Sequence, residues 1–257
     1  MQALRGVNVI VHLAAFKIPR YGDRIDTLLV NTKTTENILN TAVKNNSKII
    51  FSSTSDVYGK KEDFPFKEDG NLILGSPEVA RWAYAVSKIY DEHLIYAYNE
   101  KYKVPFVILR YFGVYGPGQH MDWWGGPQAL FIEKVLKGET IDIHGSGKQT
   151  RSFVFIDDVV EATIAAIDSK KAVGKTINIG TKEEISILDF AKKTASLANK
   201  KLKVKKITYK SFTGKKYEDI LRKVPSLVNA KLFLNWTPKT SLDEGLKKTI
   251  DWTQTQI

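Results

Sequence analysis

The chain has 257 residues, 43% of them apolar, which is enough to bury the core of one large domain or of one domain with a small lobe. It contains no cysteine, which excludes disulfide bonds and thiolate metal sites; nothing marks a secreted compartment, so we expect a cytoplasmic protein. The net charge of +11, from 39 basic and 28 acidic residues, suits a polyanionic partner.

Buried strands and amphipathic helices alternate along the chain. Strands are predicted at Val7–Leu13, Ser47–Ser53, Phe106–Tyr111 and Thr176–Ile179. Helices are predicted at Asp26–Asn45, Trp82–Lys101, Pro127–Lys137, Ile156–Asp168 and Ile187–Ala198. This alternation predicts an α/β fold, in which a parallel sheet carries helices on both faces.

Much of the positive charge lies between Lys200 and Lys216, which contains eight lysines. Lysine alternates there with leucine, valine and isoleucine, a pattern that predicts an edge strand with a solvated face. We therefore do not expect nucleic acid as a partner. The apolar run Val7–Ala15 is too short for a membrane span or a signal peptide, so we expect no membrane partner either.

The histidines do not predict a metal site. His12, His93, His120 and His144 are scattered without the spacing of metal ligands. We interpret each as a packed or surface residue and predict that the protein binds no metal.

A Tyr-x-x-x-Lys pair, Tyr84 and Lys88, follows the hydroxyl-rich loop Ser52–Gly59. Residues four apart lie on one face of a helix, so the Lys88 ammonium can favour the Tyr84 phenolate and lower the pKa of the phenol. Tyr84 could then act as a base near neutral pH. Thr54 or Ser53 would supply a second hydroxyl to share the proton of a sugar alcohol. The order and spacing of the two parts predict an oxidation site.

With these motifs, the chain resembles the extended short-chain dehydrogenase/reductase superfamily, and within it the NAD-dependent nucleotide-sugar epimerases, dehydratases and decarboxylases. The resemblance covers nearly the whole chain and runs through Val11–Ala15, Ser52–Gly59, Tyr84–Lys88, Arg110–Pro117, Ile143–Arg151, Phe155–Asp158, Asn178–Gly180 and Trp236–Gly245. It implies a Rossmann-like parallel sheet with a small C-terminal substrate-binding lobe, and NAD as the cofactor.

The resemblance also implies a glycine-rich turn that this sequence does not contain. Such enzymes begin with a strand, a Gly-x-x-Gly-x-x-Gly turn and a helix whose N-terminus binds the NAD pyrophosphate. Met1–Gly6 resembles the end of the helix before the fourth strand, so we expect that roughly sixty residues, about two βα steps, are missing. Neither Gly145–Gly147 nor Gly174–Thr176 can replace the turn. The sheet would then be truncated, with Val7–Leu13 as an exposed apolar edge.

By the same resemblance, residues 1–180 would form the truncated NAD-binding domain, with substrate-lobe insertions at about 113–151. Residues 181–257 would form mainly the substrate-binding lobe. Two helices of such enzymes commonly build a dimer through a four-helix bundle, and those from Asp26 and Trp82 are the candidates. We therefore expect a homodimer.

The cofactor site can be assigned by similarity. Leu13, Ala14 and Ala15 follow a strand and would run beside NAD, where small side chains allow close approach; core packing is the alternative. Tyr84 would be the base, Lys88 would hold the nicotinamide ribose, and Thr54 would complete the catalytic set. The residues expected to contact NAD are Leu13, Ala14, Ala15, Ser52, Ser53, Tyr84, Lys88, Tyr111 and Phe112.

The substrate site is expected to bind a UDP-linked sugar. Arg151 follows a glycine turn, and the family uses this arginine on the substrate diphosphate or, in decarboxylases, near the sugar carboxylate; a guanidinium offers paired donors to either anion. Arg222 resembles a second nucleotide-binding arginine, although Ser226 replaces the usual aspartate and a solvated arginine is the alternative. The expected substrate-binding residues are Thr54, Ser55, Asp56, Arg151 and Arg222.

The loop after Ser53 discriminates among the reactions of the family. Dehydratases carry Thr-Asp-Glu where this chain has Thr54, Ser55 and Asp56, so half of their carboxylate pair is absent and dehydration is disfavoured. One bacterial type of UDP-glucuronate decarboxylase carries Thr-Ser-Glu, which this chain reproduces with Asp56 one methylene shorter. A 4-epimerase needs no extra carboxylate, since its 4-keto intermediate only rotates and takes the hydride back on its other face.

We therefore predict an NAD-dependent nucleotide-sugar 4-epimerase, an isomerase of carbohydrate metabolism, with UDP-glucuronate decarboxylase as the second enzymatic reading. A catalytically silent fragment without the NAD pyrophosphate site is the alternative of a different class. The segment Gly118–Gln128, with two tryptophans between glycines, is predicted to be a mobile lid or a packed corner. Gly113 stands where the family usually has asparagine, which leaves the sugar open.

Overall fold

The computed structural model describes residues 4, 6–17, 23–121, 126–209, 211 and 217–257, and the chain divides into two compact units. Unit 1 comprises Met1–Tyr111, Glu161–Ile179 and Ser226–Thr237. Unit 2 comprises Phe112–Val160, Gly180–Pro225 and Pro238–Ile257. The predicted boundary at residue 180 differs from these units, because residues 226–237 pack within unit 1. The predicted roles, NAD binding for residues 1–180 and substrate binding for residues 181–257, stay predictions.

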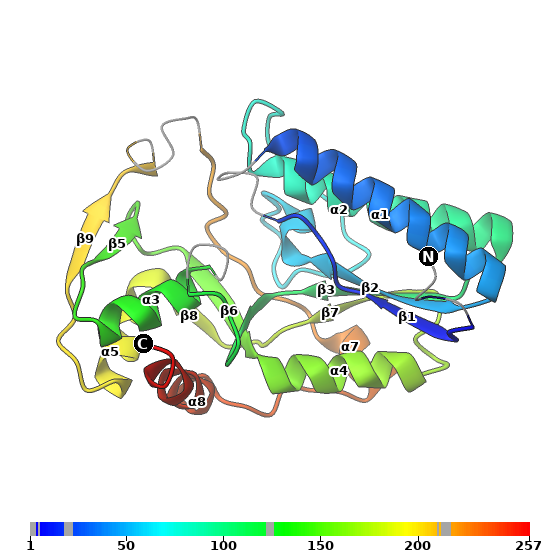
Figure 1. The fold of residues 1–257 in the computed structure, drawn as a ribbon. Helices are drawn as coiled ribbons and strands as arrows, with labels where there is room; N and C mark the ends of the chain where they lie inside the picture. Colours follow the sequence, from blue (N-terminus) through cyan, green and yellow to red (C-terminus); the bar gives the residue numbers. More distant parts are fainter. Residues whose placement is uncertain (1–3, 5, 18–22, 122–125, 210, 212–216) are drawn as a thin grey trace. The chain divides into compact units, whose positions relative to one another are not determined.

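Unit 1 is a parallel α/β sheet with helices on both faces (Figure 1). Its elements are β1 (Val9–His12), α1 (Arg24–Asn45), β2 (Lys48–Thr54), the 3-10 helix η2 (Ser55–Tyr58), α2 (Trp82–Tyr102), β3 (Phe106–Tyr111), β7 (Lys175–Ile179) and α7 (Val228–Leu234), together with most of α4 (Ile156–Asp168). The strand order is β1-β2-β3-β7, and every pair is parallel. Helices α1 and α2 cover one face, and α4 and α7 lie on the other (Figure 1).

Local sequence signals account for the long helices that cover the sheet. The Asp23 side chain accepts a hydrogen bond of 2.7 Å from the Ile25 N–H and so caps the start of α1. Asn46, in the left-handed conformation, ends α1. The two helices and the strands bury one apolar cluster, which includes Leu39 from α1 and Ile95 from α2. The carboxyl ends of the parallel strands therefore lie at a single edge of a rigid sheet.

Unit 2 contains shorter strands and its own core. Its elements are β4 (Gly113–Tyr115), α3 (Pro127–Leu136), β5 (Ile141–His144), β6 (Thr150–Phe155), β8 (Glu184–Ser186), α5 (Ile187–Leu197), β9 (Val204–Ile207) and α8 (Leu242–Gln254). One sheet has the order β4-β6-β8, and β5 pairs with β9 in a second. The buried cluster includes Phe131, Phe153 and Phe190.

The predicted α/β fold is confirmed, and all four strands and five helices of the prediction are present. Strand Phe106–Tyr111 and helix Ile156–Asp168 have the predicted bounds. An edge strand in the lysine-rich segment is also confirmed, because β9 pairs only with β5 among the described residues and its lysines are exposed. Apart from β9, the short strands of unit 2 were not predicted, and neither were helices α7 and α8.

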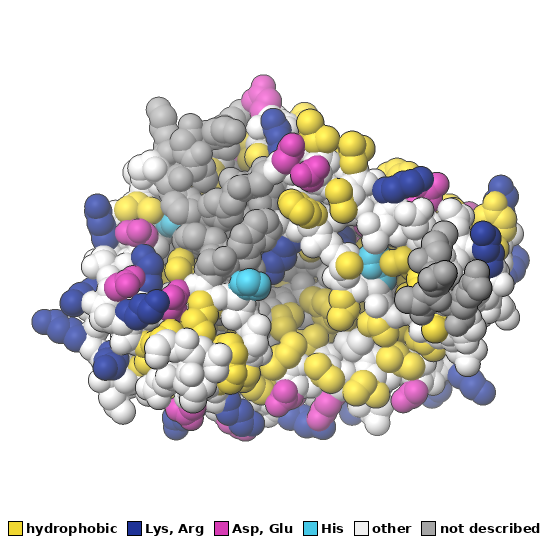
Figure 2. Space-filling model, viewed as in Figure 1, with side chains coloured by type: hydrophobic (Ala, Val, Ile, Leu, Met, Phe, Trp, Pro, Cys, Tyr) yellow, Lys and Arg dark blue, Asp and Glu magenta, His cyan; other side chains and the backbone are white. Residues whose placement is uncertain are grey.

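Strand β1 forms one edge of the unit 1 sheet, as predicted. Val11 in β1 and Leu13 after it are 38% and 60% exposed, and Ile164 on α4 is 53% exposed. Hydrophobic side chains gather over these two elements in Figure 2. Among the described residues, no helix has the length and apolar character needed to cross a membrane.

The packing of α8 in unit 2 gives a test of the fold. A Cβ atom added at Gly245 would lie 2.2 Å from the Tyr115 hydroxyl and 2.9 Å from Phe155 Cδ2. Gly245→Ala should therefore lower the free energy of unfolding by about 1–3 kcal/mol through overpacking. Urea unfolding measures this change, and Lys247→Ala on the exposed face of α8 is the control. Equal stability of the two variants would contradict the packing.

Candidate functional site

Helix α2 lies across the end of strand β2 and brings the predicted catalytic residues together. Tyr84 lies in the first turn of the helix and is half-buried, and Lys88, one turn later, is 1% exposed. The Tyr84 phenol lies near the Thr54 hydroxyl, which acts on its pKa. Lys88 Nζ donates to the main-chain oxygen of Ser52 over 2.8 Å and lies 4.4 Å from the centre of the Phe51 ring. The Tyr84, Lys88 and Thr54 side chains therefore converge on the carboxyl end of β2.

The electrostatics of Tyr84 differ from the prediction. Burial raises the pKa of the Tyr84 phenol well above its usual value, the carboxylates of Asp56 and Asp91 raise it further, and the Thr54 hydroxyl opposes them. The prediction that Lys88 lowers this pKa is wrong for this arrangement, because the ammonium is directed at the Ser52 carbonyl and the Phe51 ring.

Lys88 is itself perturbed by its surroundings. Burial lowers the pKa of its ammonium to about 8, and the nearby carboxylates of Asp91 and Glu92 oppose this shift. Burial also raises the pKa of Asp91 to about 6. Asp91 and Glu92 were not among the predicted site residues. The signal that could have found them was their spacing of three and four residues from Lys88, which places them near it on the helix.

The segment after β1 is held against the same helix. Asn31 accepts from the Phe16 N–H over 2.6 Å and donates to the Phe16 carbonyl over 3.1 Å and to Ser87 Oγ over 3.0 Å. Ser87 Oγ in turn donates to the carbonyl of Tyr84 over 2.9 Å. Asn31 thus ties the residues that follow β1 to the turn of α2 that carries Tyr84.

Three of the residues predicted to contact NAD are exposed where β1 ends. Leu13, Ala14 and Ala15 are exposed at the carboxyl end of a parallel strand, where open α/β sheets bind nucleotides. Exposure makes core packing, the alternative for these three residues, untenable. Ser52 is partly buried and Ser53 is buried in the strand that ends at Thr54.

Two further predicted cofactor residues lie at the end of β3. The Tyr111 hydroxyl shares a hydrogen bond of 2.8 Å with Thr163 Oγ1 of α4, and burial raises the pKa of this phenol. Phe112 is 2% exposed and packs near Gly180, where an added Cβ would lie 2.9 Å from Phe112 Cβ. A contact of either residue with NAD stays a prediction.

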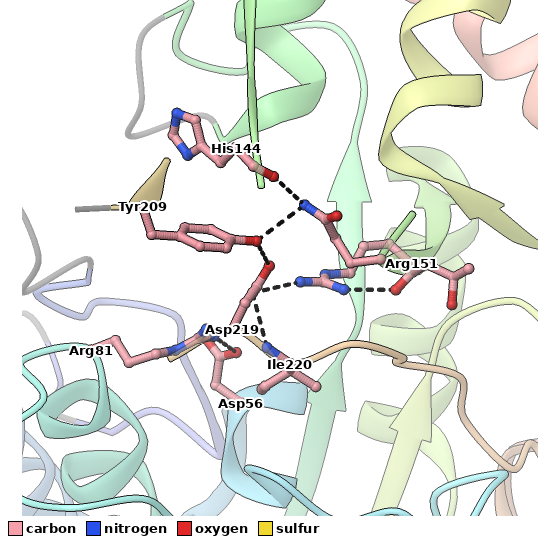
Figure 3. Close-up of polar contacts among 9 residues, drawn as sticks. Asp56, Arg81, His144, Arg151, Tyr209, Asp219 and Ile220 are labelled. Carbon is pink, nitrogen blue, oxygen red and sulfur yellow. Dashed lines mark hydrogen bonds and ion pairs between the residues drawn. The ribbon is translucent and has the colours of Figure 1, made fainter. Parts of the chain in front are cut away.

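The loop after β2 carries a carboxylate with a basic partner. Thr54 Oγ1 accepts from the Asp56 N–H over 3.2 Å and so caps η2, in which Ser55 is buried. The Asp56 carboxylate lies 3.6 Å from the Arg81 guanidinium, which precedes α2 and lies 5.0 Å from the centre of the Trp82 ring (Figure 3). The loop therefore carries a carboxylate that pairs with a guanidinium and whose charge acts on Tyr84.

Within unit 2, Arg151 belongs to a network of polar side chains (Figure 3). Its guanidinium donates to Asp219 Oδ1 over 3.0 Å and to the Thr150 carbonyl over 2.7 Å. The Tyr209 hydroxyl donates to the other Asp219 oxygen over 2.5 Å, and Gln149 Nε2 donates to Tyr209 over 3.3 Å. Arg151 is thus held in one direction by a partly buried acidic partner.

Arg222, the second predicted arginine, also has a carboxylate partner. Its guanidinium donates to both oxygens of Glu184 over 2.8 and 2.6 Å, and Thr150 donates to the same carboxylate over 3.0 Å. Arg222 is exposed, so this ion pair is compatible with the solvated alternative, and a role in nucleotide binding stays a prediction. Asp219 and Glu184 were not predicted, because each lies far in sequence from the arginine that it pairs with.

His12 is packed, as expected, and lies in the predicted site. It is 3% exposed, and its Nε2 lies 3.1 Å from Thr35 Oγ1. Among the described residues, no group of three histidine, aspartate or glutamate side chains could hold a metal ion, and the absence of a metal stays a prediction. The two tryptophans of the predicted lid, Trp123 and Trp124, lie outside the described residues.

Comparison with known proteins identifies relatives of the whole chain. Residues 1–180 match the NAD dependent epimerase/dehydratase family. The chain is 36% identical over 247 residues to UDP-N-acetyl-alpha-D-glucosaminuronate decarboxylase of Bacillus cytotoxicus, covering 95% of the chain and 76% of the relative. It is 33% identical to UDP-glucuronic acid decarboxylase 1 of Xenopus tropicalis, covering 98% of the chain but only 58% of the relative, which is less than two thirds of that protein.

A solved structure gives a second kind of match. UDP-glucuronic acid 4-epimerase from Bacillus cereus, in complex with UDP-glucuronic acid and NAD, superposes with a TM-score of 0.88 at 31% identity. The match covers 100% of this chain and 78% of that one. Relatives of both reaction types therefore share this fold, and NAD is the cofactor of the family.

The buried state of His12 predicts how stability depends on pH. Burial, and then the Lys88 charge, lower the pKa of His12 from 6.5 to about 4. Between these values the unfolded chain binds a proton that the folded chain does not, so the free energy of unfolding falls as the pH falls. At pH 5 the loss from this one group is roughly 2 kcal/mol.

Urea unfolding at pH 7 and pH 5 measures this loss. His12→Gln, whose amide can still bond to Thr35, should lose less stability than the wild type over this interval. His93→Gln changes an exposed histidine and is the matched control. The assignment is wrong if His12→Gln and the wild type lose the same amount.

Proposed function

Because the chain belongs to the NAD dependent epimerase/dehydratase family, we propose that it oxidises C4 of a UDP-linked uronate and that loss of the uronate carboxyl group follows. The observation that carries the proposal is the placement of Tyr84 near Thr54 and of the Lys88 ammonium at the Ser52 carbonyl. Two of the relatives are decarboxylases of UDP-uronates, and this supports the reaction chosen. It replaces 4-epimerisation, the reaction we predicted first, as the leading proposal.

In the oxidation, Tyr84 takes the proton of the C4 hydroxyl and Thr54 holds the oxygen. The chemistry that NAD supplies when bound is the reversible acceptance of a hydride from a sugar carbon. Because the pKa of Tyr84 is raised, a nearby cation is needed to stabilise the phenolate as it forms. Lys88 lies one turn away on the same helix face, and its flexible side chain can swing from the Ser52 carbonyl toward the phenol.

The second step follows from the chemistry of the oxidised sugar. In a 4-keto uronate, the C6 carboxylate is attached to C5, next to the C4 carbonyl. When the C5–C6 bond breaks, carbon dioxide leaves and the electron pair passes into the C4 enolate. A proton then adds to C5, and return of the hydride to C4 gives a UDP-pentose.

The residues for this step are the charged groups near Tyr84 and the arginines of unit 2. The Asp56 carboxylate acts on Tyr84 and pairs with the Arg81 guanidinium. Arg151 and Arg222 would bind the diphosphate, and their carboxylate partners would yield to this more highly charged anion. Residues 13–15, with Tyr84 and Lys88, would hold the nicotinamide ribose end of NAD.

A 4-epimerase is the second candidate. Ser55 is buried and leaves Asp56 as the one carboxylate of the Thr54–Asp56 loop, and a solved relative is a UDP-glucuronic acid 4-epimerase. Both reactions start from the same 4-keto uronate and differ only in whether the carboxyl group leaves. We also propose a cytoplasmic location, which the absence of cysteine favours.

The chain is also proposed to form a homodimer through α1 and α2. These helices lie side by side on one face of the sheet (Figure 1). Apolar side chains on them are exposed, including Ile25 at 62%, Leu29 at 63% and Tyr90 at 53%. A second copy would bury this surface in a bundle of four helices.

The product of the reaction tests the proposed function. The chain is incubated with NAD and UDP-glucuronate, and the nucleotide sugars are separated and weighed by mass spectrometry. We expect a UDP-pentose and carbon dioxide; UDP-galacturonate would instead support the 4-epimerase. Tyr84→Phe should lower kcat by about 10²–10⁴-fold with little change in substrate affinity. Tyr90→Phe, an exposed tyrosine of the same helix, is the control. The proposal is rejected if neither UDP-pentose nor UDP-galacturonate forms, or if Tyr84→Phe keeps full activity.

The homodimer has its own test. Light scattering should give twice the 29.0 kDa mass of the chain for the wild type. Leu29→Glu places a charge in the proposed interface and should give monomers. Leu232→Glu changes a residue of α7 that is equally exposed, at 62%, and should leave the dimer intact. A monomeric wild type would contradict the interface.

A further inference from the structure

Helix α2 contacts three consecutive residues of β2 through side chains spaced four apart. Tyr84 lies near Thr54, Lys88 donates to the carbonyl of Ser52, and Glu92 accepts from Ser53 Oγ over 2.5 Å. Residues at such spacing lie along one face of a helix. The first two contacts involve the proposed catalytic residues. The third has no part in the mechanism so far.

The Glu92 carboxylate is fully engaged inside unit 1. Its Oε1 also accepts from Arg110 Nε over 3.0 Å, and its Oε2 accepts from Arg110 Nη2 over 2.7 Å. Ser53, Glu92 and Arg110 are 4%, 5% and 5% exposed. Ser53 and Arg110 are also direct partners in the β2–β3 pairing. The carboxylate is thus fixed by a guanidinium from the neighbouring strand.

Arg110 is itself held from its other sides. Its Nη1 donates to the Glu68 carbonyl over 3.2 Å, and its guanidinium lies 4.9 Å from the centre of the Tyr58 ring. The Tyr58 hydroxyl donates to Asn178 Oδ1 over 2.7 Å, and the Asn178 N–H donates to Glu68 Oε1 over 2.8 Å. These contacts join β2, α2, β3 and β7 around one buried ion pair.

Stability alone does not explain such a pair. Replacing a buried ion pair by packed apolar side chains is often neutral or stabilising, because both charges lose their hydration. What the pair provides is a fixed direction for one hydroxyl. If the Ser53 side chain turned, its buried hydroxyl would lose its acceptor, and Glu92 Oε1 would keep only the donor Arg110 Nε.

We propose that Glu92, oriented by Arg110, is a positioning residue that fixes Ser53 and, through it, the main chain of Ser52–Thr54. The Thr54 hydroxyl then faces Tyr84, and the Ser52 carbonyl faces Lys88. This inference rests on the proposed function of Tyr84 and Thr54. Small errors of position matter here, since a displacement of about 1 Å at a reacting group can lower a rate roughly a hundredfold.

Ser53→Ala tests the inference most cleanly, because it removes the link to Glu92 and keeps the Glu92–Arg110 pair. We expect kcat to fall about ten- to a hundredfold while the affinity for UDP-glucuronate stays near the wild-type value and the Tm falls no more than in the control variant. Ser47→Ala removes another buried serine hydroxyl, one that donates to the Val7 carbonyl over 2.5 Å outside the site, and is the matched control. It should lower the Tm without lowering kcat.

A double variant separates positioning from general stability. If Glu92 acts through Ser53, Ser53→Ala with Glu92→Gln should have nearly the kcat of Glu92→Gln alone, because the two changes break one connection. Independent, multiplying losses in kcat would overturn the inference. So would a wild-type kcat in Ser53→Ala.

Hydrogen exchange gives a readout that needs no turnover. In Ser53→Ala, the amides of residues 52–56 should exchange faster than in the wild type, while those of α1 stay unchanged. Unchanged exchange at residues 52–56 would overturn the inference, whether or not the chain turns over UDP-glucuronate. If the wild type shows no turnover but the exchange changes as expected, the proposed function fails and the positioning of the segment stands.

Discussion

The packing of α2 across the carboxyl end of β2 is the constraint on which the candidate site depends. Three side chains of the helix, Tyr84, Lys88 and Glu92, contact successive residues of the strand. A parallel strand buried between neighbours cannot shift its register without breaking its ladder of hydrogen bonds. The strand β2 therefore has a fixed position, and α2 holds the side chains of Tyr84, Lys88 and Glu92 against it.

Burial sets the charge state of this site. Removal from water lowers the pKa of Lys88 to about 8 and raises the pKa of Asp91 to about 6. The charge of each residue opposes the shift of the other, because Asp91 raises the pKa of Lys88 and Lys88 lowers the pKa of Asp91. The phenol of Tyr84 is pushed the opposite way from what its role as a base requires. Movement of Lys88 toward Tyr84 is the adjustment that would reconcile the structure with the proposed oxidation.

The sequence predicted the parallel sheet because its strands are continuous apolar runs and its helices are long and amphipathic. Tyr84, Lys88 and Thr54 were predicted to act together from spacing and order, and the structure brings them together. Other features depend on pairing between distant segments, which local patterns do not contain. The three-residue strands β4 and β8 and the pairing of Arg110 with Glu92 are of this kind. The sign of the Tyr84 pKa shift also required the burial and the direction of Lys88.

Calorimetric titration with UDP-glucuronate and UDP-glucose, each in the presence of NAD, tests the central claim most directly. If the site holds NAD and a UDP-uronate, NAD should bind, and UDP-glucuronate should bind more tightly than UDP-glucose because its carboxylate adds a charged contact. Equal affinity for the two sugars would contradict the choice of a uronate. A folded chain that binds neither NAD nor either sugar would contradict the assignment of the site itself.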